Sequence, residues 1–204
     1  MKMKLFLLIL ALFSIVYSTD ASDNLAHLRT DKKIIRMQQA MAPYFAIQII
    51  ALKHPPGAPQ FFTNIDIARE YPCQDGYYRF CVGQYGSYEE AKSQVESVKS
   101  LGYEQAFVVN TNDYVIKGQY KRGKIDPNKI YTVQLSAFRF PVYLSHFKDL
   151  DKVKEYRLKD KIFRYCIGEF KGSDAAQEIE KYKALGYKDA FVVELDSYIP
   201  FQIE

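Results

Sequence analysis

The sequence lacks tryptophan and has only three cysteines and three histidines among 204 residues. An odd number of cysteines excludes a fully paired disulfide framework within one chain. Cys73 and Cys81 could meet across a hairpin in an oxidising compartment. The simpler interpretation makes Cys81 and Cys166 small buried strand residues. No metal-ligand spacing is present, so the sequence predicts no metal and no other cofactor.

Long apolar runs are also lacking, apart from one at the start of the chain. Lys2 and Lys4 precede an apolar stretch over 5–16, and small or polar residues follow from Ser18. This layout is typical of a secretory signal peptide, and we expect cleavage after Ser18. The rival interpretation is a retained anchor, but the run is shorter than the roughly 20 residues that span a bilayer.

The chain is therefore predicted to be periplasmic or exposed at the cell surface, with no stable membrane span after cleavage. Its formal charge is +4 and falls to +2 once Lys2 and Lys4 are removed. Export and this near-neutral balance exclude nucleic acid as a partner. Hydrophobic residues make up 48% of the chain, which is enough for packed cores.

Two stretches of the chain repeat each other at an offset of 84 to 86 residues. The strongest match aligns YRFCVGQY at 78–85 with FRYCIGEF at 163–170. Further matches lie in the same order and align 45–48 with 131–134, 101–103 with 185–187, and 106–109 with 190–193. The sequence therefore predicts two copies of one small unit.

Each copy is expected to contain a strand, a helix, a hairpin, a second helix and a strand. In the second copy, apolar and polar residues alternate over 131–138, as in a half-buried strand. A short helix over 142–150 and hairpin strands over 153–158 and 162–168 follow. In the first copy, Asp75-Gly76 is a favoured turn pair.

The second helix of each copy has clear boundary signals. Ser87 and Ser173 can cap the helices, and Gly102 and Gly186 end them. The predicted fold class is α+β, with two ferredoxin-like or RNP-like βαββαβ units. Each unit is expected to be an antiparallel four-stranded sheet with two helices on one face and the other face open.

The predicted domain boundaries follow from these repeats. Residues 1–18 are the signal peptide and 19–43 a polar tether or short helix. Residues 44–114 form the first unit, 115–129 a linker, and 130–204 the second unit.

The repeated motifs together resemble SPOR domains. Both copies carry aromatic-Arg-x-x-[Val/Ile]-Gly, then a capped helix, Leu-Gly-Tyr and Ala-Phe-Val-Val. The opening strand of the second copy, Tyr131 to Phe138, resembles that of the family, whereas the first copy has Ile50 and Leu52 at the positions of Ser136 and Phe138. The resemblance implies binding to septal peptidoglycan, to glycan strands without stem peptides, through the open sheet face.

The strand pattern predicts which side chains occupy that open face. Val133, Leu135, Phe163, Tyr165 and Ile167 are expected to point inward. The predicted glycan-binding residues are Gln134, Arg164, Ser136 and Thr132 in the second copy, and Gln48, Arg79 and Tyr44 in the first. Glutamine amides can donate to and accept from sugar hydroxyls, and an arginine can bind a muramic acid carboxylate with two hydrogen bonds.

Three other functions compete with this interpretation. Catalysis is not predicted, because His27, His54 and His146 do not recur between the copies and no matched nucleophile and base are present. An envelope protein-interaction or assembly module could use the same sheet faces. An RNA-binding module shares the order of elements, but the export signal opposes it. The favoured function is non-catalytic peptidoglycan binding in cell division or wall remodelling.

Overall fold

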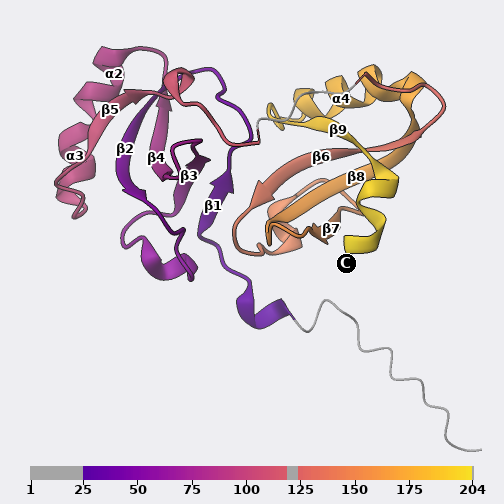
Figure 1. The fold of residues 1–204 in the computed structure, drawn as a ribbon, viewed down its shortest axis with the longest axis horizontal. Helices are drawn as coiled ribbons and strands as arrows, with labels where there is room; N and C mark the ends of the chain where they lie inside the picture. The colour runs from indigo at the N-terminus through magenta and orange to yellow at the C-terminus, as the bar shows by residue number, and fades with distance from the viewer. Residues whose placement is uncertain (1–24, 119–123, 204) are drawn as a thin grey trace, which may run out of the picture.

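The computed structural model describes residues 25–118 and 124–203 and forms one continuous mixed β-sheet (Figure 1). The predicted signal peptide lies outside these residues. The strands are β1 (Lys33–Arg36), β2 (Phe45–Leu52), β3 (Ile67–Pro72), β4 (Tyr78–Tyr85), β5 (Phe107–Asn110), β6 (Ile130–Phe138), β7 (Lys154–Arg157), β8 (Phe163–Lys171) and β9 (Phe191–Glu194). We refer to residues 44–118 as the first half and to 124–203 as the second half.

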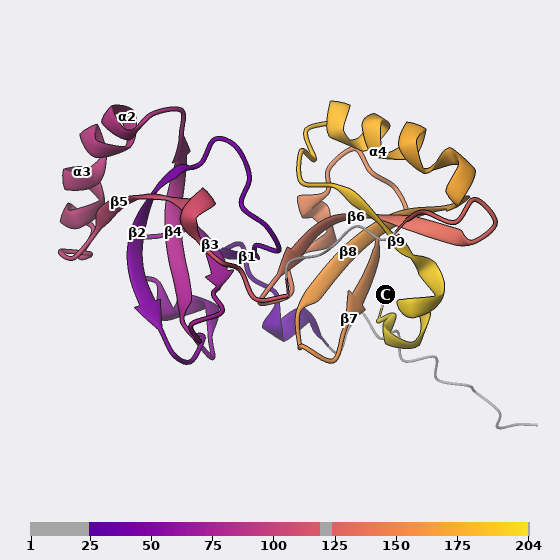
Figure 2. The ribbon, with the colours of Figure 1, turned by 45° about the horizontal axis from the view of Figure 1, so that its top comes forward.

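The strand order is β5-β2-β4-β3-β1-β6-β8-β7, and β9 pairs with β6 beside β1. Neighbouring strands are antiparallel, except that β1 runs parallel to β3. The prediction of two separate four-stranded units is therefore wrong. Strand β1 contacts both halves and joins them into a single nine-stranded sheet (Figure 2).

The predicted pair of helices in each unit is also wrong. The described residues contain three short α-helices, namely α2 (Tyr88–Ser93), α3 (Val95–Ser100) and α4 (Ala175–Ala184). Single 3₁₀ turns at Pro59–Phe61 and Leu144–His146 replace the first helix of each half. Three prolines within 55–59 prevent helical hydrogen bonding in the first half. In the second half, the amides of His146 and Phe147 bond to carbonyls three residues back.

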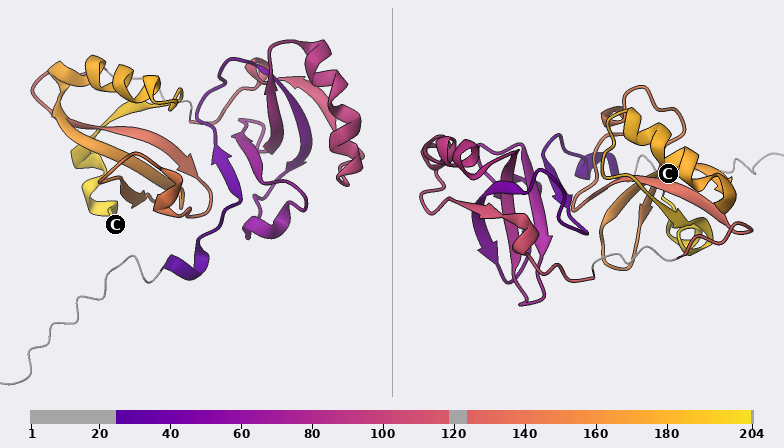
Figure 3. Two further views of the ribbon diagram at one scale, coloured as in Figure 1. Left: turned by 180° about the vertical axis from the view of Figure 1, so that it is seen from behind. Right: turned by 90° about the horizontal axis from the view of Figure 1, so that it is seen from above.

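A bridging segment, residues 29–37, connects the halves; Figure 3 shows its strand β1 between them. The sequence predicted a tether or short helix here. β1 instead aligns Ile34 with Ala68 of β3, and Arg139 donates its backbone N–H to the carbonyl of Ile34 at 3.0 Å. Lys32 anchors the segment further, because its Nζ donates to the carbonyl of Phe62 at 2.7 Å.

Of the two predicted helix caps, one is confirmed and one is wrong, and two glycines form bulges in the long strands. The predicted Ser87 cap is confirmed, since its Oγ accepts from the amide of Glu90 at 3.2 Å. The predicted Ser173 cap is wrong, because the helix begins after Asp174. Gly83 and Gly168 have φ of 70° and 74°, and the register of the β2–β4 and β6–β8 pairs shifts beside them. These glycines occupy β-bulges that other residues adopt with strain.

The inward-pointing residues were predicted correctly. Val133, Leu135, Phe163, Tyr165 and Ile167 are all buried in one core cluster. The first half has the corresponding cluster around Ile47, Phe80 and Val82. Two smaller clusters lie on the opposite face of the sheet, so that both faces of each half are packed.

Candidate functional site

The sheet face expected to be open is covered in both halves. The chain that follows the last strand of each half folds back over it. We call these stretches the first tail, residues 111–118, and the second tail, residues 195–203. Ile116 of the first tail pairs with Cys73, and Gln202 of the second tail pairs with Tyr156. The expectation of two open faces is therefore wrong, because residues beyond the repeated core supply a cover.

Each tail holds the sheet face through the same hydrogen bond. Tyr114 donates its hydroxyl to Gln48 Oε1 at 2.7 Å, and Tyr198 donates to Gln134 Oε1 at 2.9 Å. Gln134 is only 2% exposed and Gln48 is buried. Both predicted glycan-binding glutamines thus have a side-chain partner within the chain. The two tyrosines were not among the predicted site residues, although they recur at an offset of 84 residues.

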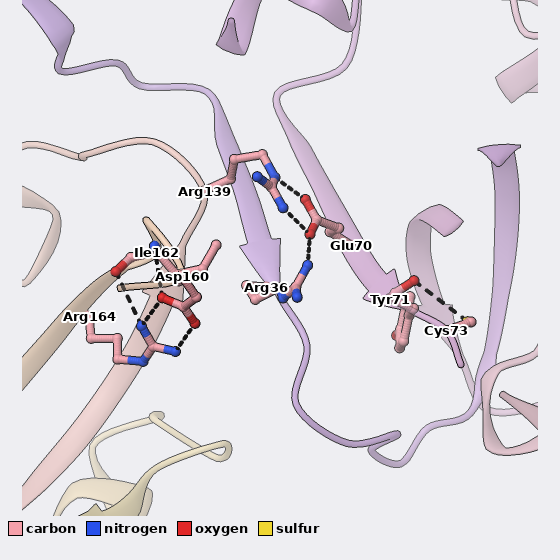
Figure 4. Close-up of polar contacts among 8 residues, drawn as sticks. All are labelled: Arg36, Glu70, Tyr71, Cys73, Arg139, Asp160, Ile162 and Arg164. Atoms are coloured by element: carbon pink, nitrogen blue, oxygen red, sulfur yellow. Dashed lines mark hydrogen bonds and ion pairs between the residues drawn. The ribbon is translucent and has the colours of Figure 1, made fainter. Parts of the chain in front are cut away.

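The two predicted arginines form a second repeated pair. Arg79 binds Asp75 with two hydrogen bonds of 3.0 and 2.6 Å, and Arg164 binds Asp160 with two of 2.9 and 2.6 Å (Figure 4 shows the second pair). The Arg79 side chain is 24% exposed, whereas that of Arg164 is 9% exposed. The arginine of the first half is therefore the more accessible one.

The remaining predicted residues lie in three different surroundings. Thr132 is buried and donates its hydroxyl to the carbonyl of Ile167 at 3.1 Å. Ser136 is half-buried, and Tyr44 is exposed near the start of β2. The seven predicted residues therefore do not form one accessible surface.

A pocket of about 330 Å³ opens beside Arg79. We call it the Arg79 pocket, and its lining consists of Cys73, Gln74, Asp75, Arg79, Asp113, Tyr114 and Val115. The guanidinium carbon of Arg79 lies 5.5 Å from the ring centre of Tyr114 and 5.9 Å from that of Tyr77. The first tail forms one wall, and the turn between β3 and β4 supplies the opposite residues. Amide, carboxylate, guanidinium and phenol groups thus meet at one concave surface.

The ion pair shapes the electrostatics of this pocket. Hydrogen bonds from Arg79 lower the pKa of Asp75, so its carboxylate is charged at neutral pH. Burial raises the pKa of the Cys73 thiol. Cys73 is therefore a protonated, weakly nucleophilic lining residue and offers no basis for covalent chemistry.

A second, smaller pocket of about 50 Å³ lies at the junction of the halves. Pairing of β6 with β9 ends at Gln134, and its pairing with β1 involves Phe138. The pocket opens along the intervening part of β6, and Gln134 and Ser136 are among its lining residues. Its volume suits a few water molecules rather than a sugar ring.

Two buried carboxylates at repeated positions were missed by sequence analysis. Glu70 accepts hydrogen bonds from Arg36 and Arg139 (Figure 4), and its side chain is fully buried. Glu155 accepts from Arg29 and from the hydroxyl of Tyr165, both at 2.9 Å. The signal was present, since Glu-Tyr recurs at 70–71 and 155–156. These contacts hold the bridging segment rather than a ligand.

The cysteines are free thiols in this structure. Cys73 bonds through its amide to the carbonyl of Tyr77, whereas Cys81 lies opposite Arg69, so the two are not cross-strand neighbours. In residues 25–118 and 124–203, no cluster of acidic, histidine and cysteine side chains could hold a metal. Over the same ranges, no helix has the length and apolar character needed to cross a membrane.

Comparison with known proteins does not assign this chain. A scan against protein-family models, a search of curated proteins and a search of solved structures each found no match. The resemblance to SPOR domains therefore stays a prediction from the repeated motifs.

Proposed function

We propose that this chain is a non-catalytic peptidoglycan-binding protein of the bacterial envelope that acts in division or wall remodelling. The observation that carries the proposal is the Arg79 pocket. Here a predicted glycan-binding residue lines a concave site of a size typical for ligands. The SPOR-like repeat motifs supply the ligand class.

The lining of the pocket suits a sugar chain. Carboxylates accept hydrogen bonds, a guanidinium donates them, and the amide of Gln74 does both, which matches sugar hydroxyls and acetamido groups. Asp75 is about half exposed, so a carboxylate on the ligand can compete with it for Arg79. Muramic acid offers such a carboxylate once its stem peptide is removed. This route accounts for a preference for denuded strands.

The test is a pull-down of residues 19–204 with purified sacculi, before and after amidase treatment. We expect retention to rise after treatment. Arg79→Gln should weaken binding by about tenfold to a hundredfold, because a hydrogen bond to a charged group contributes about 1.5–3 kcal/mol. Lys99→Gln is the matched control, since it removes a positive charge from the exposed face of α3. Wild-type affinity in Arg79→Gln would exclude the Arg79 pocket, and no retention of any variant would exclude peptidoglycan binding.

An envelope assembly module is the second candidate. The face that was expected to be open is covered by a tail in each half, so a protein partner would have to use another surface. Strand β5 is the outermost strand of the first half, and Phe107 on it is 51% exposed. An edge strand of this kind can pair with another chain. Failure to bind sacculi together with capture of an envelope protein that β5 variants abolish would favour this function.

A further inference from the structure

The two tails end differently, and this difference points to a closed site in the second half. The first tail pairs with β3 only near Cys73. The second tail reaches further along the equivalent strand, since Gln202 pairs with Tyr156 and Ile203 donates its N–H to the carbonyl of Glu155 at 2.8 Å. Five residues that line the Arg79 pocket, namely Cys73, Asp75, Arg79, Tyr114 and Val115, have equivalents in the second half. In the same order, these are Leu158, Asp160, Arg164, Tyr198 and Ile199.

The residues under the second tail include two buried polar atoms without a hydrogen-bond partner. They are the hydroxyl of Tyr156 and Nε of Arg164. The two side chains belong to directly opposed residues of β7 and β8. Burial raises the pKa of Tyr156 to about 12, so its hydroxyl keeps its proton and can donate. Such groups cost free energy while they remain unpaired, and a polar ligand would remove that cost.

Residues 199–203 of the second tail include no buried residue, and they are held by their pairing with β7 and by the partly buried Ile203, which packs against the core. The 3₁₀ turn at Ile199–Phe201 contains no buried residue, and Ile199 is exposed. Tyr198 is different, because it is buried, bonds to Gln134 and packs its ring edge-on against Tyr156 at 5.5 Å. Residues 199–203 can therefore leave the surface while Tyr198 stays in place.

We propose that the second half contains a latent glycan-binding pocket at Arg164, closed by residues 199–203 of the second tail. The pocket would take the same hydroxyl- and carboxylate-bearing ligand as the Arg79 pocket. In this respect the inference rests on the proposed function. Opening the tail would expose Arg164 together with the hydroxyl of Tyr156, and would convert a protein with one site into a protein with two.

The closure is tested first without any ligand, by labelling with phenylglyoxal and mapping the modified peptides. In the full chain, Arg79 should react and Arg164 should be protected. Deletion of residues 199–204 should raise the rate at Arg164 to within about threefold of the rate at Arg79. Arg79 in the same molecule is the control, and its rate should not change. Continued protection of Arg164 in the folded deletion variant would overturn the proposal.

The binding arm uses denuded glycan strands released from amidase-treated sacculi. Arg79→Gln should bind weakly, and deletion of 199–204 in that background should restore binding about tenfold. Adding Arg164→Gln should remove the restored binding. If wild type binds and the deletion restores nothing, the latent site is wrong while the proposed function stands. If wild type does not bind, the proposed function fails, and the glycan assignment of the latent site fails with it.

A point variant guards against loss of folding in the deletion. Ile203→Pro removes the N–H that bonds to the carbonyl of Glu155 but leaves the chain at full length. It should produce the same ordering of labelling rates as the deletion. Full protection of Arg164 in a normally folded Ile203→Pro variant would also count against the tail as the closing element.

Discussion

The two halves share the arrangement of four antiparallel strands, the two β-bulge glycines, the arginine–aspartate pair and the tyrosine–glutamine bond. They differ where each tail ends. Arg79 lies beside a pocket and its side chain is 24% exposed, whereas the Arg164 side chain is 9% exposed. The shared contacts maintain the sheet and its cover, and under the proposal made above the divergent tail ends determine whether an arginine can reach a ligand. The arginine–aspartate pair thus forms in both halves, and the exposure of its arginine is what differs.

The halves also differ in how they use the buried glutamate. Glu70 of the first half binds Arg139 of the second half as well as Arg36. Glu155 binds Arg29 of the bridging segment and Tyr165 of its own half. Glu70 therefore contributes directly to the contact between the halves, and we expect its removal to weaken that contact most.

The largest expected effect follows from Glu70→Ala. Loss of this buried carboxylate leaves Arg36 and Arg139 without their shared partner, which we expect to cost about 3–5 kcal/mol. Urea unfolding should then show two separate transitions where the wild type shows one. Glu96→Ala, on an exposed helix face, is the control and should change the midpoint little. A single transition at the wild-type midpoint in Glu70→Ala would show that this cluster does not couple the halves.

An intermediate loss of stability is expected from substitutions at the two bulge glycines, and its size should differ between the halves. Gly83→Ala and Gly168→Ala both place a side chain at positive φ, which costs about 1–2 kcal/mol. At Gly83 the new Cβ would also collide with the ring of Tyr85, whereas at Gly168 the nearest atoms are 3.7 Å away. Gly83→Ala should therefore lower the free energy of unfolding more than Gly168→Ala. Equal losses in chemical denaturation would mean that Tyr85 moves aside freely.

The smallest expected effect concerns acid. Burial, aided by Lys33, lowers the pKa of His146 in the second half. The unfolded chain thus binds a proton more readily than the folded one, so stability is full above the ordinary histidine pKa of about 6.5 and falls as the pH drops through that value. The equivalent turn of the first half, Pro59–Phe61, has no histidine.

His146→Gln should flatten this part of the stability profile between about pH 7 and 5.5. The unfolding midpoint, measured across that range for wild type and variant, provides the readout. An unchanged slope in the variant would assign the acid sensitivity to another group.

The sequence was sufficient to predict the long strands, their inward side chains and the Ser87 cap of α2. Local patterns carry that information, because alternation and capping depend on neighbours along the chain. The first helix of each half failed for a local reason, since prolines in one half and a tightened turn in the other interrupt the helical bonds. The repeated Glu-Tyr dipeptides and tail tyrosines were visible signals that the motif comparison did not use.

Two features could not be derived from local patterns. Strand β1 has only four residues, and its partners lie 34 residues away in β3 and about 100 residues away in β6. The tails show no strong periodicity, so their position over the sheet depends on packing against Tyr71 and Tyr156. For this reason the predicted site, an open face with all seven predicted residues, differs from the observed pocket. Of those seven residues, only Arg79 lines that pocket.

The bridging segment has a consequence for the order in which this protein can be completed during synthesis. Its residues are synthesised before both halves, yet Arg29 must wait for Glu155, which emerges 126 residues later. The strands of the first half can associate as they emerge, but the central seam of the sheet closes only when nearly the whole chain is available. An interrupted chain that ends before Arg139 would keep its first four-stranded half while β1 lacked one of its two neighbours. The nine-stranded sheet can therefore be completed only after the second half has been synthesised.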